Sequence, residues 1–219
     1  MFEAVIFDWD GTLGDTRQVI VVSFKKALSE INISVSNQYI ERRIGIGAAE
    51  TFRDILRSAK RPFDEKTIRR LVERKSELEI ELTAQVTLFP GARELLDELR
   101  GKIRMSLASM NNRSVISHLL RAKDLEKYFS VVLTAESILH SKPDPEIFLK
   151  ASKMLKIKPE RCVVIEDSVF GVKAAKSANM CCVAVLTGVY SLLELESEKP
   201  DLIVSTLEDK RVIEYILQQ

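Results

Sequence analysis

The stretch AVIFDWDGT, from Ala4 to Thr12, decides the fold. Its first four residues form a short apolar run, which is typical of a strand buried on both faces of a sheet. The run ends in two carboxylates, Asp8 and Asp10, followed by Gly11, which lets the backbone turn tightly. We therefore expect a buried strand whose carboxyl end holds two acids in one pocket.

The same design recurs further along the chain. Four more short apolar runs each end in polar residues, at positions 104–108, 131–133, 162–165 and 183–186. Helical patterns lie between them, and Asp144 with Pro145 predicts the start of one such helix. This alternation predicts an α/β fold, a Rossmann-like parallel sheet with helices on both faces. Ligands bind at the carboxyl edge of such sheets, where all the polar endings fall.

One long segment breaks the alternation. From about Thr16 to Leu82 the apolar periodicity is helical, and one of its apolar faces includes Lys75. We predict a small all-helical cap domain at residues 15–83, inserted after the first strand. The catalytic core then consists of residues 1–14 and 84–219.

Composition excludes several classes of function. In a chain of 219 residues, 33 Lys and Arg face 32 Asp and Glu, so no basic field attracts nucleic acid. No apolar run reaches membrane-spanning length, and no membrane association or obligate protein partner is expected. The three cysteines, Cys162, Cys181 and Cys182, have no metal-binding spacing and indicate buried thiols of a cytoplasmic protein.

A second acidic pair points to a metal ion. Glu166 and Asp167 end another apolar run, so neighbouring parallel strands would bring them close to Asp8 and Asp10. Four clustered carboxylates need a cation. Because every candidate ligand is an oxygen, Mg²⁺ in contact with a phosphate group is the natural choice.

The remaining polar residues favour phosphoryl chemistry. Ser109, at the end of its own strand, can donate a hydroxyl hydrogen bond, and Lys142 can place a positive charge on a phosphoryl oxygen. A carboxylate can act as a nucleophile through an aspartyl phosphate, and a second carboxyl group can protonate the leaving oxygen. These residues predict a two-step phosphatase that acts on a small phosphorylated metabolite.

Four segments carry a family resemblance. They are DWDGTLGDT from Asp8, LASMNN around Ser109, KPDPEIF from Lys142, and VVIEDSVFGVKAAKSANM from Val163. Together they resemble the motifs of haloacid-dehalogenase-like hydrolases, in the helical-cap branch that includes phosphoglycolate phosphatases and beta-phosphoglucomutases. Asn179 stands where the fourth motif usually has glycine, and asparagine tolerates the left-handed backbone of such a turn.

The resemblance implies roles for individual residues. Asp8 would be the nucleophile and Asp10 the general acid and base. Ser109, the backbone amide of Met110, and Lys142 would hold the phosphoryl group.

It also implies a metal site. Mg²⁺ would be bound by Asp8, Asp167 and the backbone carbonyl of Asp10. Glu166 would support the ion, either directly or through water.

Two other functions stay open from the sequence. Sugar phosphomutases that resemble this chain usually have a histidine where Ile20 stands and a basic residue shortly after Gly45, where this chain has none. A phosphomutase is therefore the second hypothesis. A non-enzymatic phospho-receiver module is the third, although it requires neither Asp10 nor a cap. Arg42 and Arg43 could reach a substrate carboxylate, but a solvated charged surface is the favoured interpretation.

Overall fold

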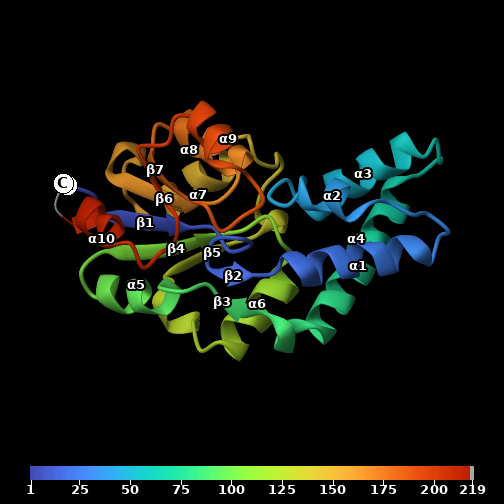
Figure 1. Ribbon diagram of the computed structural model, residues 1–219, viewed down its shortest axis with the longest axis horizontal. Coiled ribbons are helices and arrows are strands. Elements are labelled where there is room, and N and C mark those ends of the chain that lie inside the picture. The colour runs from blue at the N-terminus through green and yellow to red at the C-terminus, as the bar shows by residue number, and fades with distance from the viewer. Residues whose placement is uncertain (218–219) are drawn as a thin grey trace.

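The computed structural model describes residues 1–217, arranged as two lobes (Figure 1). A six-stranded parallel sheet with the order β5-β4-β1-β6-β7-β8 forms the centre of the larger lobe. The strands are β1 (Ala4–Phe7), β4 (Arg104–Ala108), β5 (Val131–Leu133), β6 (Cys162–Glu166), β7 (Cys181–Val185) and β8 (Leu202–Val204). The chain builds outward from β1 on one side and then returns to its other side at β6. The junction of β1 and β6 is thus the point where ligands bind in such sheets.

Helices cover both faces of this sheet (Figure 1). One face packs against α5 (Ala92–Leu99), α6 (Arg113–Ala122) and α10 (Lys210–Leu217), and the other against α7 (Glu146–Leu155), α8 (Val169–Ser177) and α9 (Leu192–Ser197). Short 3-10 helices lie at Thr83–Gln85, Glu126–Tyr128, Ala135–Ser137 and Pro159–Arg161. Side chains of a strand alternate between the faces. Val5 accordingly joins the first hydrophobic layer and Ile6 the second, and the predicted α/β, Rossmann-like fold is confirmed.

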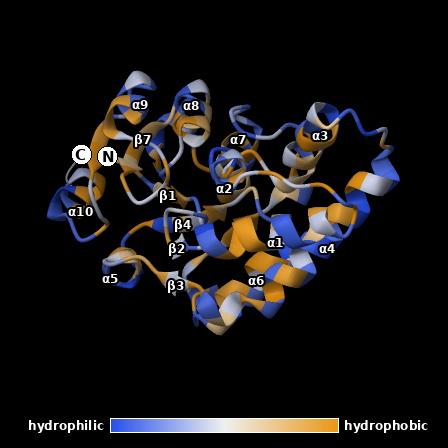
Figure 2. Cartoon of the chain, turned by 45° about the vertical axis from the view of Figure 1, so that its right-hand side comes forward, coloured by the Kyte–Doolittle hydropathy of each residue, from blue (hydrophilic) through white to orange (hydrophobic). Residues whose placement is uncertain are grey.

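The smaller lobe consists of helices only. They are α1 (Arg17–Ser29), α2 (Asn37–Glu41), α3 (Ala48–Ser58) and α4 (Glu65–Glu81), and we call them the helical lobe. Their apolar residues form a separate hydrophobic core, in which the rings of Phe24 and Phe52 lie 4.7 Å apart. Figure 2 shows hydrophobic stretches along α1 and α4 interrupted by hydrophilic turns, as expected of amphipathic helices. The boundaries of a cap domain at 15 and 83 stay a prediction.

The structure differs from the sequence expectations in three short segments. A small antiparallel sheet of β2 (Gly14–Asp15) and β3 (Thr87–Leu88) joins the lobes where only hinges were expected. Two-residue strands are too short for periodicity to show, and the three-residue β8, in which only Val204 is fully buried, is not among the predicted strands. Helix α7 begins at Glu146 instead of Pro145, although Asp144 Oδ1 still accepts the Glu146 N–H at 2.9 Å.

Three smaller features bear on the sequence expectations. Asn179 has φ +58°, so it occupies the left-handed turn after α8 as expected. All three cysteines are free thiols, and Cys162 and Cys182 are buried as predicted, whereas Cys181 is only half-buried. Burial raises the pKa of Cys162 to about 12. Within residues 1–217, no helix is both long and apolar enough to cross a membrane. The location of the protein in the cell stays a prediction.

Candidate active site

The register of β1 and β6 brings the two acidic loops together. Phe7 pairs with Ile165, so Asp8 on one strand end faces Glu166 and Asp167 on the other. Carboxylate oxygens of these three acids all lie within 4.8 Å of one another, and all three side chains are buried. The expected meeting of the two acidic pairs therefore occurs at the carboxyl edge of the sheet.

Lys142 lies in the middle of these acids. Its side chain is 0% exposed, so it is not a solvated lysine of a surface turn. Its Nζ donates to Asp8 Oδ1 at 2.6 Å, to Glu166 Oε1 at 2.7 Å and to the Ala108 carbonyl at 3.2 Å. These three hydrogen bonds take up all three N–H donors of the ammonium group. Burial alone would lower the pKa of Lys142, but the two carboxylates beside it raise it, so the side chain stays charged.

One ammonium group does not neutralise three carboxylates. Burial raises the pKa of both Asp8 and Asp167 well above the usual range for a carboxyl group. At Asp8 the positive charge of Lys142 acts in the opposite direction and lowers the pKa, but it does not outweigh burial. A further cation would relieve this cost, because it stabilises the ionised forms. The all-oxygen donor set suits a hard divalent ion.

Two glycines make room around Asp167. A Cβ atom at Gly11, whose φ is +89°, would lie 2.2 Å from Asp167 Oδ2, and one at Gly188 would lie 2.0 Å from the same oxygen. Asp167 Oδ1 accepts the hydroxyl of Thr12 at 3.2 Å. Because both residues are glycines, no side chain at either position lies against Asp167 Oδ2.

Glu166 is held by the protein on both of its oxygens. Oε1 accepts Lys142, while Oε2 accepts the N–H groups of Asp167 and Ser168 at 2.9 Å and the Ser168 hydroxyl at 3.0 Å. Ser168 also caps α8, since its hydroxyl accepts the Gly171 N–H. With both oxygens engaged, Glu166 is better suited to a metal-bound water than to direct coordination.

Asp10 is positioned by three side chains. Oδ1 accepts the Thr16 hydroxyl at 2.8 Å and Asn111 Nδ2 at 3.4 Å, and Oδ2 accepts the Ser109 hydroxyl at 3.2 Å. Sequence reasoning assigned no role to Thr16 or Asn111. The signal was nevertheless present, because both lie inside the segments DWDGTLGDT and LASMNN. Ser109, expected on the phosphoryl group, here contacts Asp10.

The helical lobe closes over this edge of the sheet. A cavity of about 30 Å³ remains between the lobes. Its lining comprises Asp10, Ile20, Phe24, Arg43, Ile44, Gly45, Gly47, Ala48, Thr51, Lys75, Met110 and Asn111. Met110, expected to bind a phosphoryl group through its amide, thus lies at the boundary between Asp10 and the helical lobe. The cavity is too small to hold a phosphorylated metabolite in this arrangement of the lobes.

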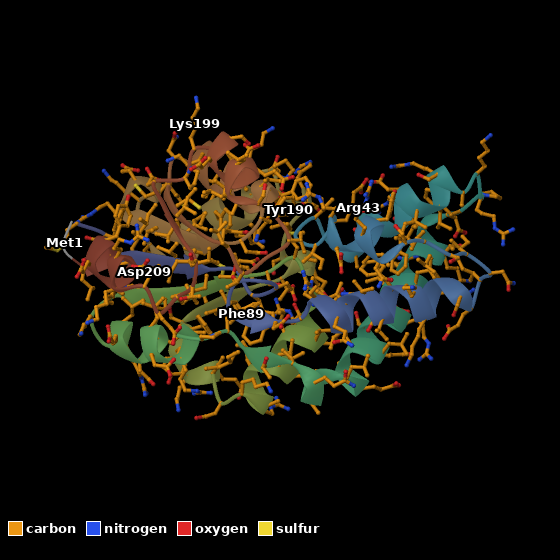
Figure 3. The ribbon with its side chains drawn as sticks, viewed as in Figure 1. Met1, Arg43, Phe89, Tyr190, Lys199 and Asp209 are labelled. Atoms are coloured by element: carbon orange, nitrogen blue, oxygen red, sulfur yellow. The ribbon has the colours of Figure 1, made fainter. Side chains whose placement is uncertain are left out.

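The two arginines after α2 are half-buried and make specific contacts. Arg42 pairs with Glu194, its guanidinium lies 4.3 Å from the ring centre of Tyr190, and its carbonyl accepts the Tyr190 hydroxyl at 2.9 Å. Arg43 lies 3.7 Å from the ring centre of Tyr39. Figure 3 labels Tyr190 and Arg43 where the helical lobe approaches the sheet. Both side chains stay partly exposed, as the favoured interpretation expected, and Arg42 in addition connects the lobes.

A family comparison agrees with this geometry. Residues 5–185 match the family model described as haloacid dehalogenase-like hydrolase. The chain belongs to the haloacid dehalogenase-like hydrolases. Asp8, Asp10, Ser109, Lys142 and Asp167 all fall inside the matched segment, so the family resemblance of the sequence motifs is confirmed.

Similar proteins of this family include both phosphatases and mutases. The chain is 35% identical to a phosphorylated carbohydrates phosphatase from Thermotoga maritima, over 81% of this chain and 82% of the relative. It is 32% identical to beta-phosphoglucomutase from Bacillus subtilis, over 85% and 84% of the two chains. The crystal structure of beta-phosphoglucomutase from Clostridium difficile superposes with a TM-score of 0.88 at 28% identity, covering 100% and 98%.

Proposed function

We propose that this haloacid dehalogenase-like hydrolase is a Mg²⁺-dependent phosphatase that hydrolyses a small phosphomonoester through an aspartyl phosphate on Asp8. The observation that supports the proposal most is that the two neighbouring carboxylates accept hydrogen bonds from different kinds of donor. Asp8 is bound to a charged lysine, whereas Asp10 accepts only neutral donors, namely Thr16, Ser109 and Asn111. The Lys142 charge favours the ionised, nucleophilic form of Asp8 against the effect of burial, and a Mg²⁺ ion would add to it. The neutral donors around Asp10 suit a proton-transfer role.

The reaction then takes two displacement steps. A carboxylate oxygen of Asp8 attacks phosphorus, the bond to the leaving oxygen breaks, and Asp10 supplies the proton to that oxygen. Asp10, now ionised, takes a proton from water as the water attacks the phosphorus of the aspartyl phosphate. The bond to Asp8 breaks, inorganic phosphate leaves, and both acids return to their starting states.

The phosphoryl oxygens need donors that do not move during the reaction. Lys142 is fixed by Asp8, Glu166 and Ala108, and its charge lies next to the attacking group. We assign the Ser109 hydroxyl and the amide of Met110 to the phosphoryl group. In this structure the one hydroxyl proton of Ser109 is donated to Asp10, so binding of a phosphoryl oxygen would require the hydroxyl to turn from the acid to the phosphate before the reaction.

The residues fit a resident Mg²⁺ ion. Asp8 and Asp167 would bind it with the backbone carbonyl of Asp10, and Glu166 would reach it through water. When bound, the ion offsets charge on the carboxylates and the phosphoryl oxygens. We further propose that the helical lobe acts as a cap that excludes water other than the attacking one.

A phosphomutase stays the second candidate because relatives of that name match most of the chain. A mutase must hold a second phosphate group in the cavity between the lobes. Apolar Ile20 stands where such mutases usually have a histidine, which favours the phosphatase, although the cations Arg43 and Lys75 also line that cavity. A phospho-receiver module would require neither the network around Asp10 nor the helical lobe.

Phosphate release tests the proposal directly. Inorganic phosphate is measured with p-nitrophenyl phosphate, phosphoglycolate, hexose phosphates and nucleotides, with Mg²⁺ and with a chelator. We expect release that needs Mg²⁺ and that disappears in Asp8→Asn, whose amide is a poor nucleophile. Undiminished release by Asp8→Asn would contradict the role of Asp8. A sugar phosphate that is isomerised only with a bisphosphate primer, without net phosphate release, would support the mutase.

A further inference from the structure

The helical lobe contains a buried ion pair close to the active site. Lys75 and Glu79 lie one turn apart on α4, their side chains are 4% and 2% exposed, and Nζ lies 2.7 Å from Oε2. Such a pair is expensive to desolvate, and apolar residues of similar volume stabilise a protein as well or better. A lysine on the apolar face of a helix therefore needs a reason beyond stability.

The pair extends to the proposed acid and base. Lys75 Nζ also donates to Asn111 Oδ1 at 3.2 Å. Asn111 Nδ2 in turn lies 3.4 Å from Asp10 Oδ1 and 3.5 Å from Glu79 Oε1. Lys75, Asn111 and Asp10 all line the cavity between the lobes. The organic part of a substrate whose leaving oxygen meets Asp10 would thus lie against Lys75.

Lys75 has a hydrogen-bond donor to spare. An ammonium group has three N–H donors. Glu79 and Asn111 take two of them, and the third makes no hydrogen bond within the described residues. Nζ lies 5.4 Å from the centre of the Phe24 ring, which also lines the cavity, so a hydroxyl group beside that ring could accept the third N–H. Thr51 adds a hydroxyl oxygen that can still accept, because it donates its own proton to the Gly47 carbonyl at 2.9 Å. One free donor and one free acceptor, next to the apolar side chains of Ile20, Phe24 and Ile44, suit hydroxyl groups.

The charges of this wall are balanced. The negative charge of Glu79 offsets the positive charge of Lys75. Arg43 is the second cation of the helical lobe that lines the cavity, and its Nε lies 3.8 Å from Asp54 Oδ2. Burial raises the pKa of Glu79 while Lys75 opposes the shift, so the two charges depend on each other. Arg43 Nε is buried and makes no hydrogen bond within residues 1–217, but each of the two cations already has an acid within ion-pair distance. A second anionic group on the substrate would lose its hydration here without gaining a cation that lacks an acid beside it.

We propose that the Lys75–Glu79 pair selects the organic part of the substrate. Lys75 donates to a hydroxyl group of an uncharged carbon skeleton, such as a sugar or a polyol, and Glu79 cancels the charge that would attract a carboxylate or a second phosphate. This inference rests on the proposed phosphatase function. It makes Glu79 a specificity-determining residue that acts through Lys75.

Two substrates of equal carbon number test this selection. Glycerol 3-phosphate carries a hydroxymethyl group where 3-phosphoglycerate carries a carboxylate. We expect the wild-type protein to prefer glycerol 3-phosphate in kcat/KM. Glu79→Gln keeps the shape of the side chain but leaves the charge of Lys75 uncancelled. It should shift the ratio of kcat/KM toward 3-phosphoglycerate by about tenfold or more, as expected for one uncompensated charge at short range.

Control variants separate selection from folding. Glu77→Gln removes an acid from the same helix, where its side chain is 63% exposed, and should leave the ratio unchanged. Lys75→Met combined with Glu79→Leu removes both charges at similar volume, and should lose the preference for glycerol 3-phosphate without gaining activity on 3-phosphoglycerate. If Glu79→Gln does not fold, this double variant carries the test.

The outcomes are distinguishable from those of the proposed function. Equal loss of kcat/KM for both substrates in Glu79→Gln would mean that the pair is merely structural, and would overturn the inference. A ratio of kcat/KM for the two substrates that is the same in Glu79→Gln as in the wild-type protein would also overturn the inference. If the wild-type protein does not hydrolyse even p-nitrophenyl phosphate with Mg²⁺, the proposed function itself fails.

Discussion

Replacement of Lys142 by methionine should destabilise the protein strongly. The ammonium group is fully buried and is the donor to two carboxylates, Asp8 and Glu166. Methionine keeps the volume but leaves both acids buried without their cation. Removing one partner of a buried ion pair costs about 3–5 kcal/mol, and we expect a loss of unfolding free energy in that range. Protonation of Asp8, whose pKa burial already raises, keeps the loss from being larger.

Urea unfolding in the presence of a chelator measures this loss. Trp9 is the single tryptophan and is buried beside the site, so its fluorescence reports on unfolding there. Lys153→Met on the exposed side of α7 is the matched control and should change the free energy of unfolding by less than about 0.5 kcal/mol. Adding Glu166→Gln to Lys142→Met should recover part of the loss, because it removes one unpaired charge. A loss below about 1 kcal/mol for Lys142→Met would refute the reasoning.

Three further changes have defined outcomes. Gly11→Ala would place a Cβ atom 2.2 Å from Asp167 Oδ2, and should weaken Mg²⁺ binding by at least about tenfold in calorimetry; unchanged affinity would contradict the proposed metal site. Asp10→Asn should slow phosphate release by about a hundredfold or more and accumulate phosphorylated enzyme, whereas full activity would exclude Asp10 as the acid and base. Hydrogen bonding to Arg42 lowers the pKa of Glu194 from 4.5 to about 2, so this pair stabilises the protein above pH 4.5 and ceases to do so as the pH falls toward 2. The Tm difference between wild type and Glu194→Gln should shrink over that window, and a constant difference would contradict the linkage.

Much of the fold could be predicted because its pattern is local. Apolar runs such as Ala4–Phe7 are buried on both faces, and each ends in a polar loop at the same edge of the sheet. A parallel sheet then brings Asp8 near Glu166 and Asp167, whatever the details of the loops. Pairings of two residues, as between β2 and β3, depend on loop conformation and left no periodic signal.

The partners of each side chain were harder to predict than the site itself. Lys142 was expected on a phosphoryl oxygen, yet its three donors are taken by Asp8, Glu166 and Ala108. Contacts to Asp10 from Thr16 and Asn111 depend on how two loops fold against each other, which spacing does not show. The contacts of Arg42 across the lobes likewise depend on tertiary structure, and composition alone suggested a solvated residue.

Trapping of the covalent intermediate tests the central claim most directly. Asp10→Asn is mixed with p-nitrophenyl phosphate and Mg²⁺, quenched rapidly and reduced with borohydride, which converts an aspartyl phosphate to homoserine. Peptide mass spectrometry should find homoserine at position 8, and none when Asp8→Asn is added to the same variant. Rapid p-nitrophenol release by the wild-type protein with no modified residue at position 8 would contradict a reaction through Asp8.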